Sequence, residues 1–350
     1  MTEGSGPIRV LVVDDSATVR GHIVDILSAD PTFTVVGEAT DGRQAIEACE
    51  RLRPDVMTMD MMLPVLSGLA ATEYIMAYCP TPIVVVSSAE NRGEVFRTYD
   101  AIAAGAVDVL EKPTASTPPE EWANKLAFVL RVASRIRVVT HLRKRLPAAL
   151  PSVRAAPASE IRVVCVGAST GGPGAVRRLL LDLPGGFPVP VILVLHIGEP
   201  FDATLADWLD AQTAHRVGFA THGQSLFDAG PRVIMAPAGR HLRVASGKLY
   251  LDDGPERHSC RPSVDVLFES IAKEMGVNTA GVLLTGMGRD GANGLLEIRK
   301  AGGYTIAQDE ASSVVYGMPR AAVELGAAKS VLPLDLIGGA LARVVRGARE

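Results

Sequence analysis

The sequence has no apolar run near the ~20 residues that a membrane-spanning helix needs, and residues 1–7 are polar and glycine-rich, without a secretion-signal pattern. We therefore expect a cytoplasmic protein with no membrane insertion. Cysteine is also scarce. The four cysteines lack the close spacing of metal ligands; three lie in apolar or helix-like stretches, and Cys260 lies in a polar loop. We expect incidental or buried thiols in a reducing compartment.

A basic domain is absent as well, which argues against nucleic acid as a partner. The net charge is −4, and residues 1–113 carry 8 Lys and Arg against 17 Asp and Glu. Residues 114–160 reverse this balance with 8 against 3, and residues 161–350 carry 19 of each. Since the basic excess falls in and around a linker, solvated helix charges are our interpretation, with a basic interaction patch as the alternative.

The length of 350 residues and the 47% hydrophobic content suit two globular domains. In the first part, apolar strands are expected at 8–13, 35–38, 56–59, 83–86 and 107–110, with helices at about 17–28 and 42–52 between the first three. This alternation predicts a doubly wound parallel sheet of the flavodoxin-like kind, an α/β fold. Ligands of such sheets bind beyond the carboxyl ends of the strands.

Polar residues gather at those carboxyl ends: Asp14, Asp15, Asp60, Ser87 and Lys112. The three aspartates would repel one another without a cation, and their oxygens are ligands that suit Mg²⁺. Asp60 could then attack a phosphoryl group as a nucleophile, with Lys112 and Ser87 binding the product's oxygens. The alternative is that such residues are simply common at strand ends, which explains one of them better than all five.

This half resembles the receiver domain of two-component response regulators. The resemblance rests on Asp14-Asp15-Ser16, Asp60, Pro64, Gly68, Ser87 and Lys112-Pro113. It implies that a histidine kinase is the phosphoryl donor to Asp60. Two positions depart from the pattern: Val109 stands where many receivers carry an aromatic residue, and Ser67 where aspartate is common.

A linker is expected between the two halves. A helix should begin near residue 118 and run to about 138, because acidic residues occupy its first turn and apolar residues follow at helical spacing. The next twenty residues are basic and then rich in proline and alanine, which argues against a continuous helix. We therefore predict a receiver domain at 1–138, a linker at 139–159 and a catalytic domain at 160–350.

The second half is organised around residues 163–174. An apolar, β-branched run leads into Gly167-x-Ser169-x-Gly171, and helical spacing begins near Pro173. The pattern matches a nucleophile elbow, in which the serine hydroxyl is exposed beside free backbone N–H groups. A phosphate-binding turn or a plain connection is the alternative. A dinucleotide loop is disfavoured because the G-x-G-x-x-G spacing is missing.

A nucleophilic serine needs a base and a group that orients the base. His196 ends a buried strand expected at 189–196, and Asp290 follows another expected at 281–285. In one Rossmann-like parallel sheet, Ser169, His196 and Asp290 would meet at the same edge. Met287, between two glycines, could offer its N–H to an oxyanion. The alternative for Asp290 is that it caps the following helix. The other six histidines are expected to be structural or solvent-exposed.

This half resembles the catalytic domain of the chemotaxis protein-glutamate methylesterases, the CheB family, over residues 161–334. The resemblance is carried by residues 167–173, His196 and Phe201, 236–237, 261–265, 284–291 and 308–319. Leu195 and Ile197 stand where glutamine and methionine are usual, a departure expected to affect packing only.

The resemblance implies hydrolysis of glutamate γ-methyl esters on chemoreceptors with release of methanol, and deamidation of glutamine as a second reaction. Ser169 would attack the carbonyl, His196 would take its proton and Asp290 would hold His196. The N–H of Met287 and Thr170 would stabilise the oxyanion. No cofactor is implied for this half.

The resemblance also implies control by phosphorylation. We expect the unphosphorylated receiver to inhibit the catalytic domain by occlusion, and a phosphoryl group on Asp60 to relieve the inhibition. A receiver-regulated binding module that does not catalyse is the alternative function.

Overall fold

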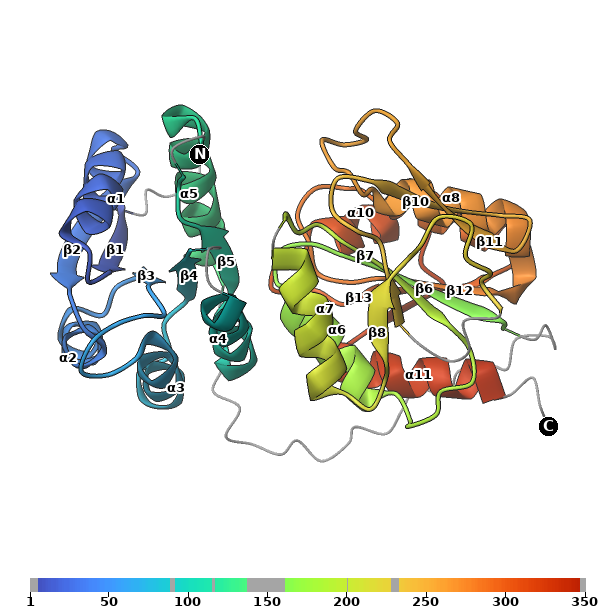
Figure 1. Cartoon of the computed structure of the whole chain (residues 1–350), viewed down its shortest axis with the longest axis horizontal. Coiled ribbons are helices and arrows are strands. Elements are labelled where there is room, and N and C mark those ends of the chain that lie inside the picture. Colours follow the sequence, from blue (N-terminus) through green and yellow to red (C-terminus); the bar gives the residue numbers. More distant parts are fainter. Residues whose placement is uncertain are drawn as a thin grey trace. The chain divides into compact units, whose positions relative to one another are not determined.

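The computed structural model of the chain describes residues 6–88, 92–114, 117–136, 161–199, 201–227 and 233–346. The chain divides into two units, Met1–Leu146 and Pro147–Glu350. Each unit is built around its own parallel sheet (Figure 1), which confirms the predicted α/β class for both. The linker predicted at 139–159 lies outside the described residues. Within the described ranges, every helix is too short or too polar to cross a membrane.

The first unit alternates strands and helices in the way the sequence predicts. Its elements are β1 (Ile8–Val13), α1 (Ala17–Ala29), β2 (Phe33–Ala39), α2 (Gly42–Leu52), β3 (Val56–Met59), α3 (Gly68–Tyr78), β4 (Ile83–Ser87), α4 (Arg92–Ala104), β5 (Asp108–Glu111) and α5 (Pro119–Ala133). The strands are parallel in the order β2-β1-β3-β4-β5, the flavodoxin-like order. Helix α1 contacts α5, whereas α3 contacts both α2 and α4, so the helices cover both faces of the sheet.

Local sequence explains where these helices begin. The side chains of Ser16, Asp41 and Ser67 each accept a hydrogen bond from a backbone N–H in the first turn of α1, α2 and α3. Between them the strands β3 and β4 are buried along their whole length. Polar side chains can therefore lie at the ends of these central strands and in the loops that follow them.

The second unit is larger. Its elements are β6 (Val163–Ala168), α6 (Gly172–Asp182), β7 (Val191–Leu195), α7 (Phe201–Gln212), β8 (Val217–Phe219), β9 (Val233–Met235), β10 (His241–Ala245), β11 (Lys248–Asp252), α8 (Val264–Met275), η1 (Gly276–Asn278), β12 (Thr279–Leu283), α9 (Ala292–Lys300), β13 (Tyr304–Gln308), α10 (Met318–Glu324), β14 (Ser330–Leu332) and α11 (Leu334–Arg346). Seven parallel strands pair in the order β14-β13-β12-β6-β7-β9-β8, and β10 and β11 form a separate antiparallel pair.

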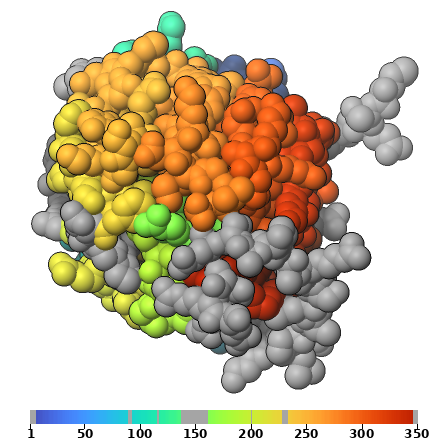
Figure 2. Space-filling view, turned by 90° about the vertical axis from the view of Figure 1, so that its right-hand side faces the viewer, coloured from blue at the N-terminus to red at the C-terminus, as the bar shows by residue number. Residues whose placement is uncertain are grey.

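Helices cover both faces of the larger sheet. Helix α6 packs against α7 and α11, while α8 packs against α9 and against strand β10 (Figure 1). In the space-filling view, the orange segment that includes β10, β11 and α8 forms a continuous surface beside the red C-terminal segment (Figure 2). Strand β6 lies between β7 and β12, so the chain leaves it first to one side and later to the other. Such a reversal creates a crevice at the carboxyl ends of the strands.

The limits of β2, β4 and β5 differ by one or two residues from the strands expected in the first unit. Two expected strands of the second unit also differ from those observed. The strand expected at 189–196 is β7, which begins after Pro190, because proline has no N–H to donate to the sheet. The strand expected at 281–285 is β12, which starts and ends two residues earlier. The N–H of Thr285 donates to the side chain of Gln308 rather than to a neighbouring strand.

Candidate functional site

Ser169 follows β6 directly, in a tight turn that leads into α6. Its N–H donates to the carbonyl of Thr285 at 3.0 Å, and its own carbonyl accepts the N–H of Gly172 at 2.6 Å. Gly171 has φ +73°, a left-handed conformation that glycine adopts without strain. Ser169 is half-buried, and no hydrogen bond to its hydroxyl occurs in the described part of the chain. The turn thus presents an unpaired hydroxyl at the end of a central strand.

The loop after β12 lies against this serine. A Cβ on Gly286 would come within 2.8 Å of the Ser169 Cβ, so only the absence of a side chain allows this approach. Met287 follows with an exposed side chain, and Gly288 has φ +81°. The Thr285 hydroxyl donates to the carbonyl of Thr170 at 3.0 Å, which joins the loop to the serine turn.

His196 and Asp290 contact each other. The His196 Nε2 lies 2.9 Å from the Asp290 Oδ2, and their side chains are 13% and 2% exposed. The backbone N–H of His196 donates to the carbonyl of Ala168 at 3.1 Å, which holds this histidine next to the serine turn. Because a carboxylate only accepts, Nε2 carries the proton and Nδ1 is the nitrogen left for another partner. No hydrogen bond between Ser169 and His196 is present among the described residues.

Asp290 is held by the first turn of α8. Its Oδ1 accepts from the Ser263 hydroxyl at 2.7 Å and from the Asp265 N–H at 3.1 Å, and its Oδ2 accepts from the Val264 N–H at 2.7 Å. The alternative that Asp290 caps the following helix is wrong, since α9 is preceded by Gly291 with no side-chain cap. A helix N-terminus is a favourable place for a carboxylate, because its N–H groups are free to donate.

These contacts shift both pKa values in the direction of an ion pair. Burial alone would raise the pKa of Asp290, but hydrogen bonds from His196, Ser263 and Val264 lower it. Burial alone would lower the pKa of His196, but its contacts with Asp290 and Cys260 raise the pKa to about 9. The imidazole is therefore protonated at neutral pH in the resting site. Nδ1 must lose its proton before the imidazole can act as a base, whereas Nε2 keeps the proton that it donates to Asp290.

Cys260 is a neighbour of His196 that the sequence analysis did not identify. Its Sγ lies 3.6 Å from the His196 Nδ1 and 3.3 Å from the carbonyl oxygen of His258. His196, Cys260 and Asp290 offer ligand atoms within 4.8 Å of one another. Cys260 and Asp290 contact different nitrogens of the ring, Nδ1 and Nε2 respectively.

The acidic residues of the first unit also converge. Carboxylate oxygens of Asp14, Asp15 and Asp60 lie within 4.8 Å of one another, and Asp14 and Asp60 are buried. The Lys112 Nζ lies 3.0 Å from both the Asp14 Oδ2 and the Asp60 Oδ2. Burial raises the pKa of Asp60, and Asp14 adds to the rise, although Lys112 offsets part of it. Burial opposes the charge of Lys112, yet the two carboxylates raise the pKa of its ammonium.

The donor set fits a divalent cation with oxygen ligands. The Asp14 Oδ2 is buried without a hydrogen-bond partner, and among the described residues its polar contact is the ion pair with Lys112. Three carboxylates against one ammonium leave an excess of negative charge in a partly buried crevice. Mg²⁺ prefers one or two carboxylates plus water and phosphate oxygens, which this arrangement can supply.

The hydroxyl of Ser87 is hydrogen-bonded to side chains of α4. It donates to the Glu94 Oε1 at 3.0 Å and accepts from the Thr98 hydroxyl at 3.0 Å, both on α4. Glu94 also accepts from the N–H and the hydroxyl of Ser88, each at 2.9 Å. Glu94 was not identified from the sequence, and its carboxylate accepts the hydroxyl of Ser87 in this conformation.

Together these features define a two-domain class of protein, an ester hydrolase joined to a phosphorylation receiver. The family model described as CheB methylesterase matches residues 164–341, and the model of the response regulator receiver domain matches residues 10–118. The chain belongs to the CheB methylesterase family and carries a response-regulator receiver domain. It is a carboxylic ester hydrolase.

Relatives match nearly the whole chain. A protein-glutamate methylesterase/protein-glutamine glutaminase of Anaeromyxobacter dehalogenans is 45% identical over 346 residues, covering 98% of both chains. One from Symbiobacterium thermophilum is 41% identical over 358 residues and covers 97% of both. The crystal structure of the Thermotoga maritima CheB methylesterase catalytic domain is 35% identical, with a TM-score of 0.50, and covers 53% of this chain and 100% of that one.

Proposed function

We propose that this chain is a phosphorylation-activated protein-glutamate methylesterase that hydrolyses glutamate γ-methyl esters on chemoreceptors in the cytoplasm. The observation that carries the proposal is the contact between His196 and Asp290 beside the turn that presents Ser169. The names of the relatives support the substrate class. An arrangement of nucleophile, base and orienting carboxylate is what acyl transfer requires.

In the proposed mechanism, the Ser169 oxygen attacks the ester carbonyl while the His196 Nδ1 takes the hydroxyl proton. Asp290 holds the resulting imidazolium through Nε2, and the N–H of Met287 with Thr170 stabilises the oxyanion. The bond between the carbonyl carbon and the methoxy oxygen breaks, and methanol leaves with the proton from His196. Water then hydrolyses the acyl-enzyme, with His196 acting as base again, and the glutamate carboxylate is released.

The receiver would act through Asp60. We propose that its carboxylate accepts a phosphoryl group from a histidine kinase, with Asp14, Asp15 and Asp60 holding Mg²⁺. The bound ion would offset the charge of the phosphoryl oxygens. Lys112 would bind a phosphoryl oxygen, and Ser87 would leave Glu94 to donate its hydroxyl to another.

Methanol release from a methylated receptor fragment tests the proposal. Ser169→Ala should lower the rate by about 10⁴-fold or more, since one nucleophile carries the covalent step, and His196→Ala should cost nearly as much because such residues act as a unit. The circular dichroism of both variants should match the wild type. Substantial turnover by a folded Ser169→Ala variant would remove the serine mechanism, and a wild type that binds the fragment without releasing methanol would leave a non-catalytic binding module.

A second reaction, deamidation of glutamine, is supported by the relatives' names alone. The same attack by Ser169 on a carboxamide would release ammonia in place of methanol. Ammonia release from a fragment with glutamine at the modified position tests it, and dependence on Ser169 would assign both reactions to one site.

A further inference from the structure

His241 is a buried histidine with both ring nitrogens engaged. It begins β10 and is 1% exposed. Its Nε2 lies 3.0 Å from the carbonyl oxygen of Pro255, and its Nδ1 lies 3.1 Å from the backbone N of Ser263. A carbonyl can only accept and an N–H can only donate, so Nε2 carries the proton and Nδ1 offers a lone pair. The two contacts together require the neutral ring with one defined tautomer.

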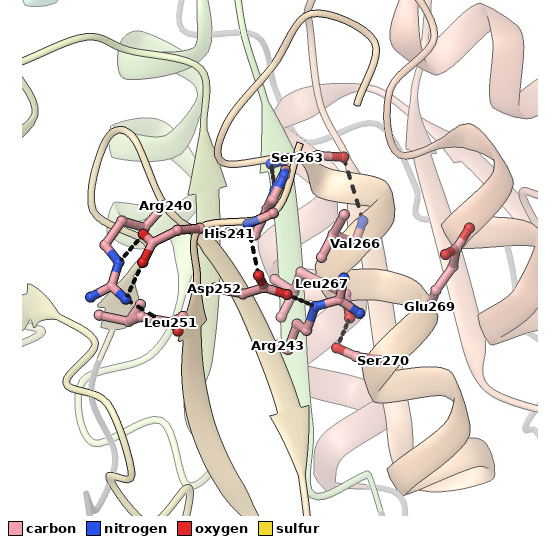
Figure 3. Close-up of polar contacts among 12 residues, drawn as sticks. Arg240, His241, Arg243, Leu251, Asp252, Ser263, Val266, Leu267, Glu269 and Ser270 are labelled. Atoms are coloured by element: carbon pink, nitrogen blue, oxygen red, sulfur yellow. Dashed lines mark hydrogen bonds and ion pairs between the residues drawn. The ribbon is translucent and has the colours of Figure 1, made fainter. Parts of the chain in front are cut away.

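Ser263 connects this ring to the catalytic pair. It precedes α8, and its hydroxyl accepts from the Val266 N–H at 3.4 Å and donates to the Asp290 Oδ1 at 2.7 Å. Figure 3 shows the ring of His241 next to Ser263 at the N-terminal end of α8. The Asp290 Oδ2, which contacts His196, also accepts from the next residue, Val264. Two hydrogen-bonded steps therefore separate His241 from the carboxylate that orients His196.

We propose that His241 is a positioning residue for ester hydrolysis: by accepting the N–H of Ser263, it sets the first turn of α8, and that turn holds Asp290 against His196. The inference rests on the roles proposed above for Asp290 and His196. His241 does not reach Asp290 directly, so its effect passes through backbone geometry. Because a hydrogen bond of about 2.9 Å loses strength steeply with misalignment, a small shift of this turn weakens the hold on the carboxylate.

The hydrogen bonds of the first turn of α8 favour this role for His241. Asp290 is buried and negative, and it is stabilised by three donors from the first turn of α8 in addition to His196. Without an acceptor at position 241, the buried N–H of Ser263 would lose its partner. An unsatisfied buried donor is costly, so the turn would move to find another partner.

Two substitutions separate the two contacts of His241. In His241→Asn the amide oxygen lies near the position of Nδ1 and can accept from Ser263, while the donor to Pro255 is lost. In His241→Gln the amide nitrogen lies near the position of Nε2 and keeps the donor, while the acceptor for Ser263 is lost. His222→Gln is a matched control, since His222 is exposed and contacts Leu251 rather than the first turn of α8.

We expect His241→Gln to lower kcat about tenfold or more with KM within about twofold, and His241→Asn to stay within about threefold of the wild type. His222→Gln should equal the wild type. The dependence of kcat/KM on pH provides a second readout. Its acid limb, the range over which the rate rises with pH, reports the pKa of His196. A weaker contact between Asp290 and His196 should move that limb to lower pH in His241→Gln and leave it unchanged in His241→Asn.

Equal losses in both variants, in proportion to their loss of thermal stability and with an unmoved acid limb, would overturn the proposal and leave His241 as a packing residue. Wild-type activity in His241→Gln would also overturn it. If neither variant folds, ¹⁵N NMR of the wild type decides: an imidazolium or an Nδ1-protonated ring at position 241 at pH 7 contradicts the required tautomer. Ser169→Ala is measured in parallel, because activity in that variant would refute the proposed function independently of His241.

Discussion

Each unit has a buried aspartate at the carboxyl edge of its sheet, Asp60 in the first and Asp290 in the second. The surroundings shift the pKa values of these two aspartates in opposite directions. Asp60 shares its crevice with two other aspartates and one lysine ammonium, and its pKa is raised. Asp290 accepts three hydrogen bonds from the first turn of α8 and one from His196, and its pKa is lowered. The charge of Asp60 is therefore poorly stabilised in the resting state, whereas both carboxylate oxygens of Asp290 accept hydrogen bonds.

The difference corresponds to the two roles that we propose for these side chains, phosphoryl acceptor for Asp60 and orienting group for Asp290. A carboxylate that must form a bond to phosphorus benefits from few fixed hydrogen bonds, because its lone pairs stay available to the incoming group. A carboxylate that must orient an imidazole benefits from being fixed, since preorganised partners need not rearrange during the reaction. The environment of each aspartate therefore indicates whether it reacts or positions.

Exchanging each aspartate for asparagine tests this comparison with the largest expected effect. Asp290→Asn should lower kcat about 10³-fold and reduce the free energy of unfolding by about 1–3 kcal/mol, because an amide nitrogen would face donors of α8. Asp60→Asn should leave the unfolding free energy equal or higher, since it removes charge from an overcharged crevice. Denaturant unfolding of both variants decides, and a destabilised Asp60→Asn would break the comparison.

The pH profile gives the next largest effect. The contacts with Asp290 and Cys260 overcome burial and raise the pKa of His196 to about 9, so the neutral base is a minority below that pH. We expect kcat/KM to rise about tenfold per pH unit between pH 7 and 8 and to level off above 9. In Asp290→Asn the limb should move toward the ordinary value of about 6.5. A wild-type profile that is already flat at pH 7 would contradict the ion pair.

Control by the receiver should give a smaller effect. If the unphosphorylated receiver inhibits, a fragment of residues 159–350 should release methanol about five- to tenfold faster than the whole chain without phosphate. Acetyl phosphate with Mg²⁺ should raise the rate of the whole chain and leave Asp60→Asn and the fragment unchanged. A fragment no faster than the unphosphorylated chain would rule out inhibition by occlusion and leave the receiver as a docking device.

The smallest effect concerns Glu94. Its carboxylate accepts the hydroxyl of Ser87. In the proposed function, Ser87 must leave Glu94 before it can bind a phosphoryl oxygen. Glu94→Ala should therefore bind beryllofluoride with Mg²⁺ about threefold more tightly, the cost of one hydrogen bond having been removed. Glu47→Ala, at an exposed position on α2, is the control. Unchanged affinity in Glu94→Ala would mean that Ser87 exchanges partners without cost.

The sequence could predict both sheets because their strands are continuous apolar runs separated by helical spacing and by glycine or proline. It could also place Asp60 at the carboxyl edge of the first sheet, and Ser169 and His196 at the carboxyl edge of the second, since each residue directly follows a strand in the chain. Strand limits were less certain where apolar residues continue past the end of a strand, as after Leu283.

The partners of these residues could not be predicted, because tertiary packing brings them together. Cys260 lies 64 positions from His196 in the sequence, and Ser263 lies 27 positions from Asp290. Ser263 before an apolar run does signal the start of a helix. Nothing local indicates that this helix would donate its first turn to a carboxylate of a different loop.

The hydrogen bonds from α8 to Asp290 affect which residues can be substituted during the evolution of this fold. A descendant that no longer needed hydrolysis could replace Ser169 at little cost in folding, since its hydroxyl makes no hydrogen bond in the described structure. It would remain under selection to keep Asp290, whose carboxylate satisfies the N-terminus of a buried helix. Retention of this aspartate in a distant homologue therefore says little about activity, whereas retention of the serine says a great deal.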